Sequence, residues 1–192
     1  MKKKIGFFMG SFDPIHIGHI ALITGVLGKR LVDELVIVPA MANPGKKDPP
    51  EAIIHREAMI SSTLISELSD FRGRVSMTHG KGEPDPDGKY YSYRQLREIL
   101  EANPGWSKQD LYIIAGTDTA QEIPSWKNSA EILDRFKILE VDRPGWSEAQ
   151  GITCSSSGIR KMITDGLVPT PWVTTGVWET IKTYGLYGSG EK

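Results

Sequence analysis

The sequence lacks paired cysteines, a long hydrophobic run and an excess of charge of either sign. Cys154 is the single cysteine among 192 residues, so no intramolecular disulfide can form, which fits a reducing compartment. No stretch approaches the ~20 apolar residues of a membrane helix. The apolar run 5–9 that follows the N-terminal lysines is too short for the core of a signal peptide. We therefore expect a cytoplasmic protein with no membrane partner.

The charge balance argues against a nucleic acid as partner. The formal net charge is −1, from 23 basic and 24 acidic side chains, so the chain has no global positive field. An anionic substrate would have to be bound by a local cluster of donors. Apolar residues make up 39% of the chain, and the length suits one α/β domain that buries its apolar surface without disulfides.

Short apolar runs alternate along the chain with segments of helical spacing. The apolar runs predict strands at 5–9, 34–39, 74–78, 111–115 and 136–141. The helical spacing predicts helices at 18–27, 52–68, 93–102, 128–135, 155–164 and 171–184. This alternation is typical of a parallel sheet covered on both faces. We predict an α/β fold, a Rossmann-like doubly wound parallel sheet in a single domain at 1–187, with a flexible tail at 188–192.

The segment Gly10-Ser11-Phe12-Asp13-Pro14-Ile15-His16-Ile17-Gly18-His19 joins the first predicted strand to the first helix. Ligands of open α/β sheets bind at the carboxyl ends of strands, and backbone N–H groups at a helix start favour phosphate. His16 and His19, three residues apart, would lie on one helix face, where each can donate to a phosphate oxygen. Helix capping or local packing is the plainer reading of an isolated histidine pair. A metal site lacks a third Cys or His nearby in the sequence.

A second segment with phosphate-binding residue types is Cys154-Ser155-Ser156-Ser157-Gly158-Ile159-Arg160, at another predicted helix start. Hydroxyl and N–H groups at such a start can hold phosphate oxygens, and Arg160 can reach the same anion with two N–H groups. An ordinary serine N-cap with a solvated arginine is an equal alternative for this segment alone.

Together the two segments resemble motifs of the nucleotidylyltransferase superfamily. The segment 10–19 resembles its H-x-G-H signature, in which two histidines bind the triphosphate of ATP. The segment 154–160 resembles its I-S-S-T-x-I-R motif, with Cys in place of Ile and Ser in place of Thr. The resemblance implies that the catalytic residues are His16, His19 and Arg160. It implies that further ATP contacts come from Gly10, Ser11, Phe12, Ser155 and Ser156.

Three more segments resemble the nicotinate mononucleotide branch of this superfamily. Gly116-Thr117-Asp118 with the downstream Trp126 resembles its G-x-D and tryptophan, which implies that Asp118 contacts adenosine and Trp126 lies beside the pyridine nucleotide. Packing on the next helix is the alternative for Trp126. Pro44-Gly45-Lys46 takes the place of a P-H-K loop, which implies a phosphate contact by Lys46, with the neighbouring Lys47 as the alternative. The segment 173–187 resembles a final helix with a G-L-Y ending.

The sequence also departs from this branch. Met9 and Gly45 replace a usual glycine and a usual histidine, and Tyr91-Ser92-Tyr93 departs from S-Y-T. Tyr91 and Ser92 are candidates for binding the pyridine nucleotide, although a packed helix start is the simpler reading. The resemblance therefore leaves the choice between the acid and the amide form of the acceptor open.

The implied activity is transfer of AMP from ATP to nicotinate or nicotinamide mononucleotide in NAD biosynthesis, with release of pyrophosphate. The attacking phosphate is already an anion, so the reaction needs alignment and charge neutralisation more than a general base. We expect Mg²⁺ to bridge phosphate oxygens, with no dedicated protein metal site. The alternatives are another member, such as a pantetheine-phosphate adenylyltransferase, or a non-catalytic nucleotide-binding regulator. Homo-oligomerisation is left open.

Overall fold

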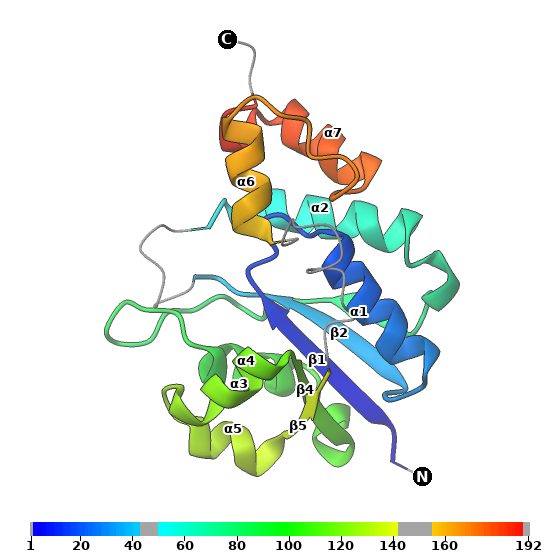
Figure 1. Cartoon of the computed structure of the whole chain (residues 1–192). Coiled ribbons are helices and arrows are strands. Elements are labelled where there is room, and N and C mark those ends of the chain that lie inside the picture. Colours follow the sequence, from blue (N-terminus) through cyan, green and yellow to red (C-terminus); the bar gives the residue numbers. More distant parts are fainter. Residues whose placement is uncertain (1, 43–49, 142–154, 190–192) are drawn as a thin grey trace. The chain divides into compact units, whose positions relative to one another are not determined.

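The computed structural model of the chain describes residues 2–42, 50–141 and 155–189 (Figure 1). The chain divides into two compact units, each built from several segments. The first, which we call the sheet unit, consists of residues 1–11, 26–49 and 73–142. The second, the helical unit, consists of residues 12–25, 50–72 and 143–192.

The sheet unit holds a five-stranded parallel sheet with the strand order β3-β2-β1-β4-β5. Its strands are β1 (Lys4–Gly10), β2 (Glu34–Pro39), β3 (Val75–Met77), β4 (Asp110–Ala115) and β5 (Lys137–Glu140). The order reverses beside β1, where Phe7 pairs with Val36 of β2 on one side and with Ile113 of β4 on the other. In open α/β sheets such a reversal opens a crevice at the carboxyl ends of the strands. The predicted α/β class is confirmed.

One core cluster fixes three helices of the sheet unit against the strands. These are α3 (Ser92–Ala102), α4 (Thr117–Glu122) and α5 (Ser129–Arg135). Phe7 of β1 is fully buried and meets the rings of Trp106 and Phe136 edge to face, at centroid distances of 5.6 and 5.3 Å. Each of these helices contributes apolar side chains to the cluster, among them Leu96, Ala120 and Ile132. The core therefore packs α3, α4 and α5 against the strands.

The helical unit is built from α2 (Ile53–Ser66), α6 (Ser156–Thr164), α7 (Thr175–Thr183) and the first part of α1 (Ile17–Gly28). α2 packs along α7, and a Cβ atom at Gly176 would lie only 3.0 Å from the Ser62 side chain. Glycine at this position allows the two helices to approach closely. Short 3-10 helices at Ser69–Phe71 and Leu186–Gly188 complete the unit.

Two predictions of helices were wrong. The last helix was predicted from residue 171 but begins at Thr175, because the Thr174 hydroxyl caps it by accepting the Val177 N–H at 3.3 Å. Helix α4 was not predicted, since its six residues carry no apolar periodicity.

In the predicted tail, Gly188 ends a 3-10 helix and Ser189 donates to the Ile181 carbonyl at 3.0 Å, while 190–192 lie outside the described residues. In the described part of the chain, no helix is both long and apolar enough to cross a membrane.

Candidate functional site

The first phosphate-type segment surrounds the beginning of α1. His16 precedes the helix as its N-cap residue, and its carbonyl accepts the N–H groups of His19 and Ile20 at 2.9 and 3.2 Å. Its ring stacks on the ring of His19, with centroids 3.7 Å apart. The two imidazoles therefore lie side by side as expected, but one comes from the cap and the other from the first turn.

The backbone fixes which nitrogen of each imidazole carries the proton. The His16 N–H donates to Nδ1 of His19 at 3.2 Å, and the Gly18 N–H donates to Nδ1 of His16 at 3.2 Å. A ring nitrogen that accepts a hydrogen bond carries no proton, so the neutral rings are protonated at Nε2. Phe12 packs its ring edge to face on His19, with a centroid distance of 5.0 Å. Hydrogen bonds from the backbone therefore hold both imidazole rings in place, and each ring has an Nε2–H group as its donor.

The second segment forms the beginning of α6. The Ser155 hydroxyl caps this helix by accepting the Gly158 N–H at 3.1 Å, so the N-cap interpretation of Ser155 is confirmed. Ser156 donates from Oγ to the Pro14 carbonyl at 3.0 Å. Arg160 donates from Nη1 to the Asp13 carbonyl at 2.7 Å, so its alternative as a solvated arginine is wrong. Hydrogen bonds of α6 thus reach directly into the turn before α1.

Asp13 belongs to the first segment, but the sequence analysis assigned it no role of its own. Its side chain is buried, with 5% of the residue exposed. One carboxylate oxygen, Oδ2, lies 3.5 Å from Arg160 Nη1, and the other, Oδ1, accepts the Tyr187 hydroxyl at 2.7 Å. The Glu51 N–H also reaches Oδ1, at 3.4 Å. Asp13 therefore joins the beginnings of α1 and α6 to the C-terminal 3-10 helix within the helical unit.

Arg56 of α2 adds a second buried charge to the helical unit. Only 1% of the residue is exposed, and Nε donates to the Glu51 carbonyl at 2.8 Å. Burial lowers the pKa of the Arg56 guanidinium from its ordinary value, whereas the negative charge of Asp13 acts in the opposite direction. Positive charge in the interior of the unit favours an anion bound at its helix beginnings.

Three predicted site residues of the sheet unit, Gly10, Ser11 and Asp118, lie at or closely after the carboxyl ends of strands. Gly10 ends β1, and its carbonyl accepts the Ala40 N–H at 2.8 Å; Ser11 follows it. Asp118 lies in the first turn of α4, directly after β4 and Gly116, and its side chain is exposed. An exposed carboxylate at this place can accept hydroxyl groups of a ribose.

Trp126, Tyr91 and Ser92 lie in packed surroundings in the sheet unit. Trp126 and Tyr91 are partly buried against the core cluster, and Ser92 begins α3. The Tyr91 hydroxyl donates to Asp87 at 2.8 Å, and the Lys127 ammonium lies 4.1 Å from the centre of the Tyr91 ring. The interpretation of 91–93 as a packed helix start is confirmed, while the contacts of these residues with a substrate stay predictions.

A charged network next to Trp126 was not predicted from the sequence. Asp85 is buried, accepts the Tyr93 hydroxyl, and accepts the Lys127 ammonium at 2.7 Å. Arg94 lies 3.6 Å from the same carboxylate. The Lys127 hydrogen bond, followed by that from Tyr93, holds the pKa of Asp85 below its usual value. The network ties the loop before α3 to the residue that follows Trp126.

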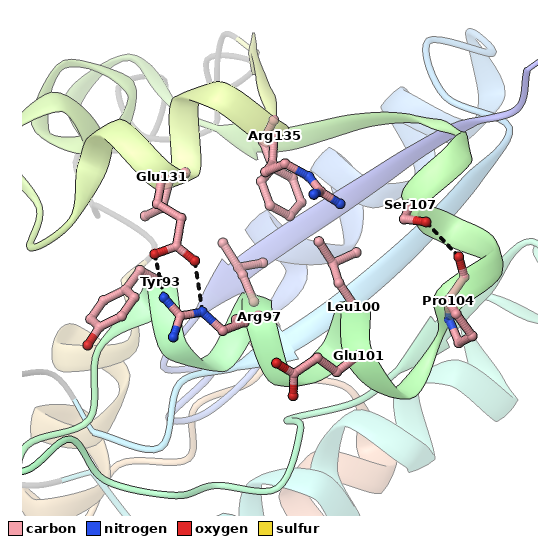
Figure 2. Close-up of a pocket in the computed structure, with 11 residues that line it drawn as sticks. Tyr93, Arg97, Leu100, Glu101, Pro104, Ser107, Glu131 and Arg135 are labelled. Carbon is pink, nitrogen blue, oxygen red and sulfur yellow. Dashed lines mark hydrogen bonds and ion pairs between the residues drawn. The ribbon is translucent and has the colours of Figure 1, made fainter.

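The sheet unit contains a cavity of about 260 Å³ between α3, the 3-10 helix Pro104–Lys108 and α5. Figure 2 shows the residues that line it. Its lining combines apolar side chains with the ion pair of Arg97 and Glu131, at 2.6 Å. The residues that line it include none of the predicted site residues. This cavity therefore does not mark the candidate site.

Lys46 and Lys47, together with Cys154, lie outside the described residues. Among residues 2–42, 50–141 and 155–189, no group of three or more His, Cys, Asp or Glu side chains could hold a metal ion.

The family model described as cytidylyltransferase-like matches residues 7–162, which include both phosphate-type segments and residues of both units. The chain belongs to the cytidylyltransferase-like family. The match extends from β1 into α6, so one family pattern covers both units.

Several named proteins resemble the chain over nearly its whole length. A protein of Tropheryma whipplei (strain Twist), named probable nicotinate-nucleotide adenylyltransferase, is 31% identical over 94% of this chain and 97% of its own. A Thermus thermophilus protein of the same name is 29% identical over 96% of this chain and 99% of its own. The solved structure of Plasmodium falciparum nicotinic acid mononucleotide adenylyltransferase complexed with NaAD covers 98% of both chains, with a TM-score of 0.75 at 20% identity. The predicted Rossmann-like fold is confirmed.

Proposed function

We propose that this cytidylyltransferase-like protein transfers AMP from ATP to nicotinate mononucleotide and releases pyrophosphate. The observation that carries the proposal is the hydrogen-bonded junction between the beginnings of α1 and α6, made by Arg160 with Asp13 and by Ser156 with Pro14. This junction brings the donors of two phosphate motifs into one unit. The names of the relatives that match nearly the whole chain support nicotinate mononucleotide as the acceptor.

In the proposed reaction, a phosphate oxygen of the mononucleotide attacks the α-phosphorus of ATP, and the bond to the leaving pyrophosphate breaks. The donors that hold the triphosphate are His16, His19, Ser155, Ser156 and Arg160. Bonds within the helical unit orient the rings of His16 and His19 and the guanidinium of Arg160, which lowers the cost of reorganisation during the reaction. Because the Ser156 hydroxyl already donates to Pro14 and the Ser155 hydroxyl caps the helix, these two serines contribute backbone N–H groups at the beginning of α6. Backbone groups of Gly10, Ser11 and Phe12 contact the reacting phosphates.

The remaining roles follow the family resemblance. Lys46 adds charge, and Asp118 accepts a ribose hydroxyl with its exposed carboxylate. Trp126, with Tyr91 and Ser92, binds the pyridine nucleotide, because a flat indole suits a pyridine ring. When bound, Mg²⁺ supplies neutralisation of phosphate charge. The proposal places this activity in the cytoplasm, as one step of NAD biosynthesis.

The acceptor is tested by measuring pyrophosphate release from ATP with a panel of three acceptors: nicotinate mononucleotide, nicotinamide mononucleotide and pantetheine phosphate. We expect release with both mononucleotides or with nicotinate mononucleotide alone, and faster release with the nicotinate form. Release only with pantetheine phosphate would assign the chain to another activity of the family. Binding of ATP without release for any acceptor would indicate a nucleotide-binding regulator.

A further inference from the structure

Tyr187 has a backbone conformation that its residue type disfavours. Its φ and ψ angles are 58° and 23°, in the left-handed region. The nearby Gly185 and Gly188 have φ angles of 61° and 78°, where glycine adopts the same region without a clash of Cβ. A bulky tyrosine between them is held there by its surroundings, which points to a role for the side chain.

The side chain of Tyr187 reaches the buried carboxylate of the first motif, 174 residues earlier in the chain. Its hydroxyl donates to Asp13 Oδ1 at 2.7 Å, while Thr164 of α6 donates to the Tyr187 carbonyl at 3.3 Å. Burial, followed by the negative charge of Asp13, raises the pKa of the Tyr187 hydroxyl well above its ordinary value. The hydroxyl therefore stays a neutral donor over the working pH range.

The contact with Tyr187 limits how Asp13 pairs with Arg160. Oδ1 accepts both the Tyr187 hydroxyl at 2.7 Å and the Glu51 N–H at 3.4 Å. Both contacts that Arg160 makes with Asp13 use Nη1. A carboxylate with both oxygens available prefers to bind a guanidinium by two parallel hydrogen bonds, which would also engage a second nitrogen of the arginine. Since Oδ1 already has two donors, Arg160 pairs with the carboxylate through Nη1 alone, and within the described residues no hydrogen bond or ion pair engages its Nη2 and Nε. The N–H groups on these two nitrogens can bind another anion.

We propose that Tyr187 is a positioning residue of the triphosphate site, which keeps Asp13 from pairing with Arg160 through both oxygens and so leaves the guanidinium for a phosphate. This inference rests on the proposed function, because the anion that Arg160 binds is the triphosphate of ATP. It also assigns a role to the G-L-Y ending, which is far from the motifs in sequence but bonded to them within the helical unit.

The experiment compares the full-length protein with its Tyr187→Phe variant, which keeps the ring and removes only the hydroxyl. The dissociation constant for ATP is measured by calorimetry, and both Michaelis constants are measured in the transfer assay. We expect the dissociation constant and the KM for ATP to rise roughly tenfold, as for a lost hydrogen bond to a charged group, with an unchanged KM for the acceptor. A purely structural defect would instead reduce the amount of active protein and leave the ATP affinity unchanged.

Tyr184→Phe is the matched control, because Tyr184 lies in the same segment, is 56% exposed and stacks on His55 rather than bonding Asp13. It should bind ATP like the wild type. If Tyr187→Phe folds poorly, Tyr187→Asn replaces it, since asparagine tolerates the left-handed region and is too short to reach Asp13. The same rise in the dissociation constant is expected.

A double-mutant cycle tests whether Tyr187 acts through Arg160. In an Arg160→Gln background, Tyr187→Phe should cause no further loss of ATP affinity. An equal loss in both backgrounds, or a Tyr187→Phe variant with wild-type ATP affinity, would overturn the inference. If the wild type binds ATP but transfers AMP to no acceptor, the proposed function fails, and the dissociation constants for ATP still decide the role of Tyr187.

Discussion

The imidazole ring of His16 stacks on that of His19, with centroids 3.7 Å apart and planes inclined by 29°. Both Nδ1 atoms accept backbone N–H groups, which sets the Nε2–H of each ring as its donor. The pair thus combines two donors with fixed orientation at one helix beginning. This arrangement suits an enzyme that must hold charge developing on phosphate oxygens.

Replacing His19 with alanine removes one of these donors. We expect a loss of transition-state stabilisation on the order of 3 kcal/mol, which corresponds to a roughly hundredfold lower kcat/KM for adenylyl transfer. Steady-state kinetics with ATP and nicotinate mononucleotide measure the effect. His79→Ala, in the segment after β3, serves as the control and should retain turnover. Undiminished turnover of His19→Ala would remove His19 from the mechanism.

Arg160→Lys keeps the positive charge but replaces the guanidinium by a single ammonium group. One ammonium cannot take the geometry in which Nη1 bonds the Asp13 carbonyl while other N–H groups face a phosphate. We expect the KM for ATP to rise about tenfold, with a smaller change in the KM for the acceptor. Lys161→Ala is the matched control on α6, because that side chain is 76% exposed and pairs with Asp165. Equal effects of the two variants would contradict the role of Arg160.

Because of the hydrogen bonds to Asp85, we expect the stability of the protein to fall at acid pH. Hydrogen bonds from Lys127 and Tyr93 lower the pKa of Asp85 in the folded protein relative to the unfolded chain. Its contribution to stability is therefore present above the unfolded value, about 4, and is lost as the pH falls through the folded value. Thermal melts of the wild type below about pH 4 should show a falling Tm.

The Asp85→Asn variant isolates this contribution. The amide carries no charge, so Tm should be lower than that of the wild type at neutral pH, and the difference should shrink in acid. A constant difference between the two proteins at all pH values would show that the carboxylate charge is not what stabilises the loop.

Phe7→Ala tests the core that positions the helices of the sheet unit. Phe7 is fully buried between the rings of Trp106 and Phe136, so its loss leaves a cavity. We expect the free energy of unfolding to fall by about 3–5 kcal/mol in denaturant titrations. Leu133→Ala on α5 is the reference, because Leu133 is 42% exposed and its replacement should change stability by less than about 0.5 kcal/mol. Similar losses for both variants would contradict the assigned core.

The sequence predicts most strands well, because fully buried parallel strands appear as continuous apolar runs. The run Glu34–Pro39 matches β2 at both ends. The sequence analysis missed helix α4 and placed the start of the last helix too early, because apolar periodicity marks the start of neither helix. Their boundaries depend on caps and on packing, which local patterns do not contain.

For the candidate site as well, the sequence predicts some features and not others. The donors of 10–19 and 155–160 are local motifs at helix beginnings, so the sequence alone indicates their chemistry. The bonds that orient them are not local: Tyr187 bonds Asp13 across 174 positions, and Lys127 bonds Asp85 across 42. Such contacts follow from the tertiary fold, and no periodicity in either partner predicts them.

A crystal structure with a non-hydrolysable ATP analogue would show whether the beginnings of α1 and α6 hold one triphosphate. We predict phosphate oxygens of a single bound analogue at hydrogen-bond distance, about 2.7–3.2 Å, from both His19 Nε2 and the Arg160 guanidinium. An analogue whose phosphates contact only one of these two residues, or neither, would contradict the account.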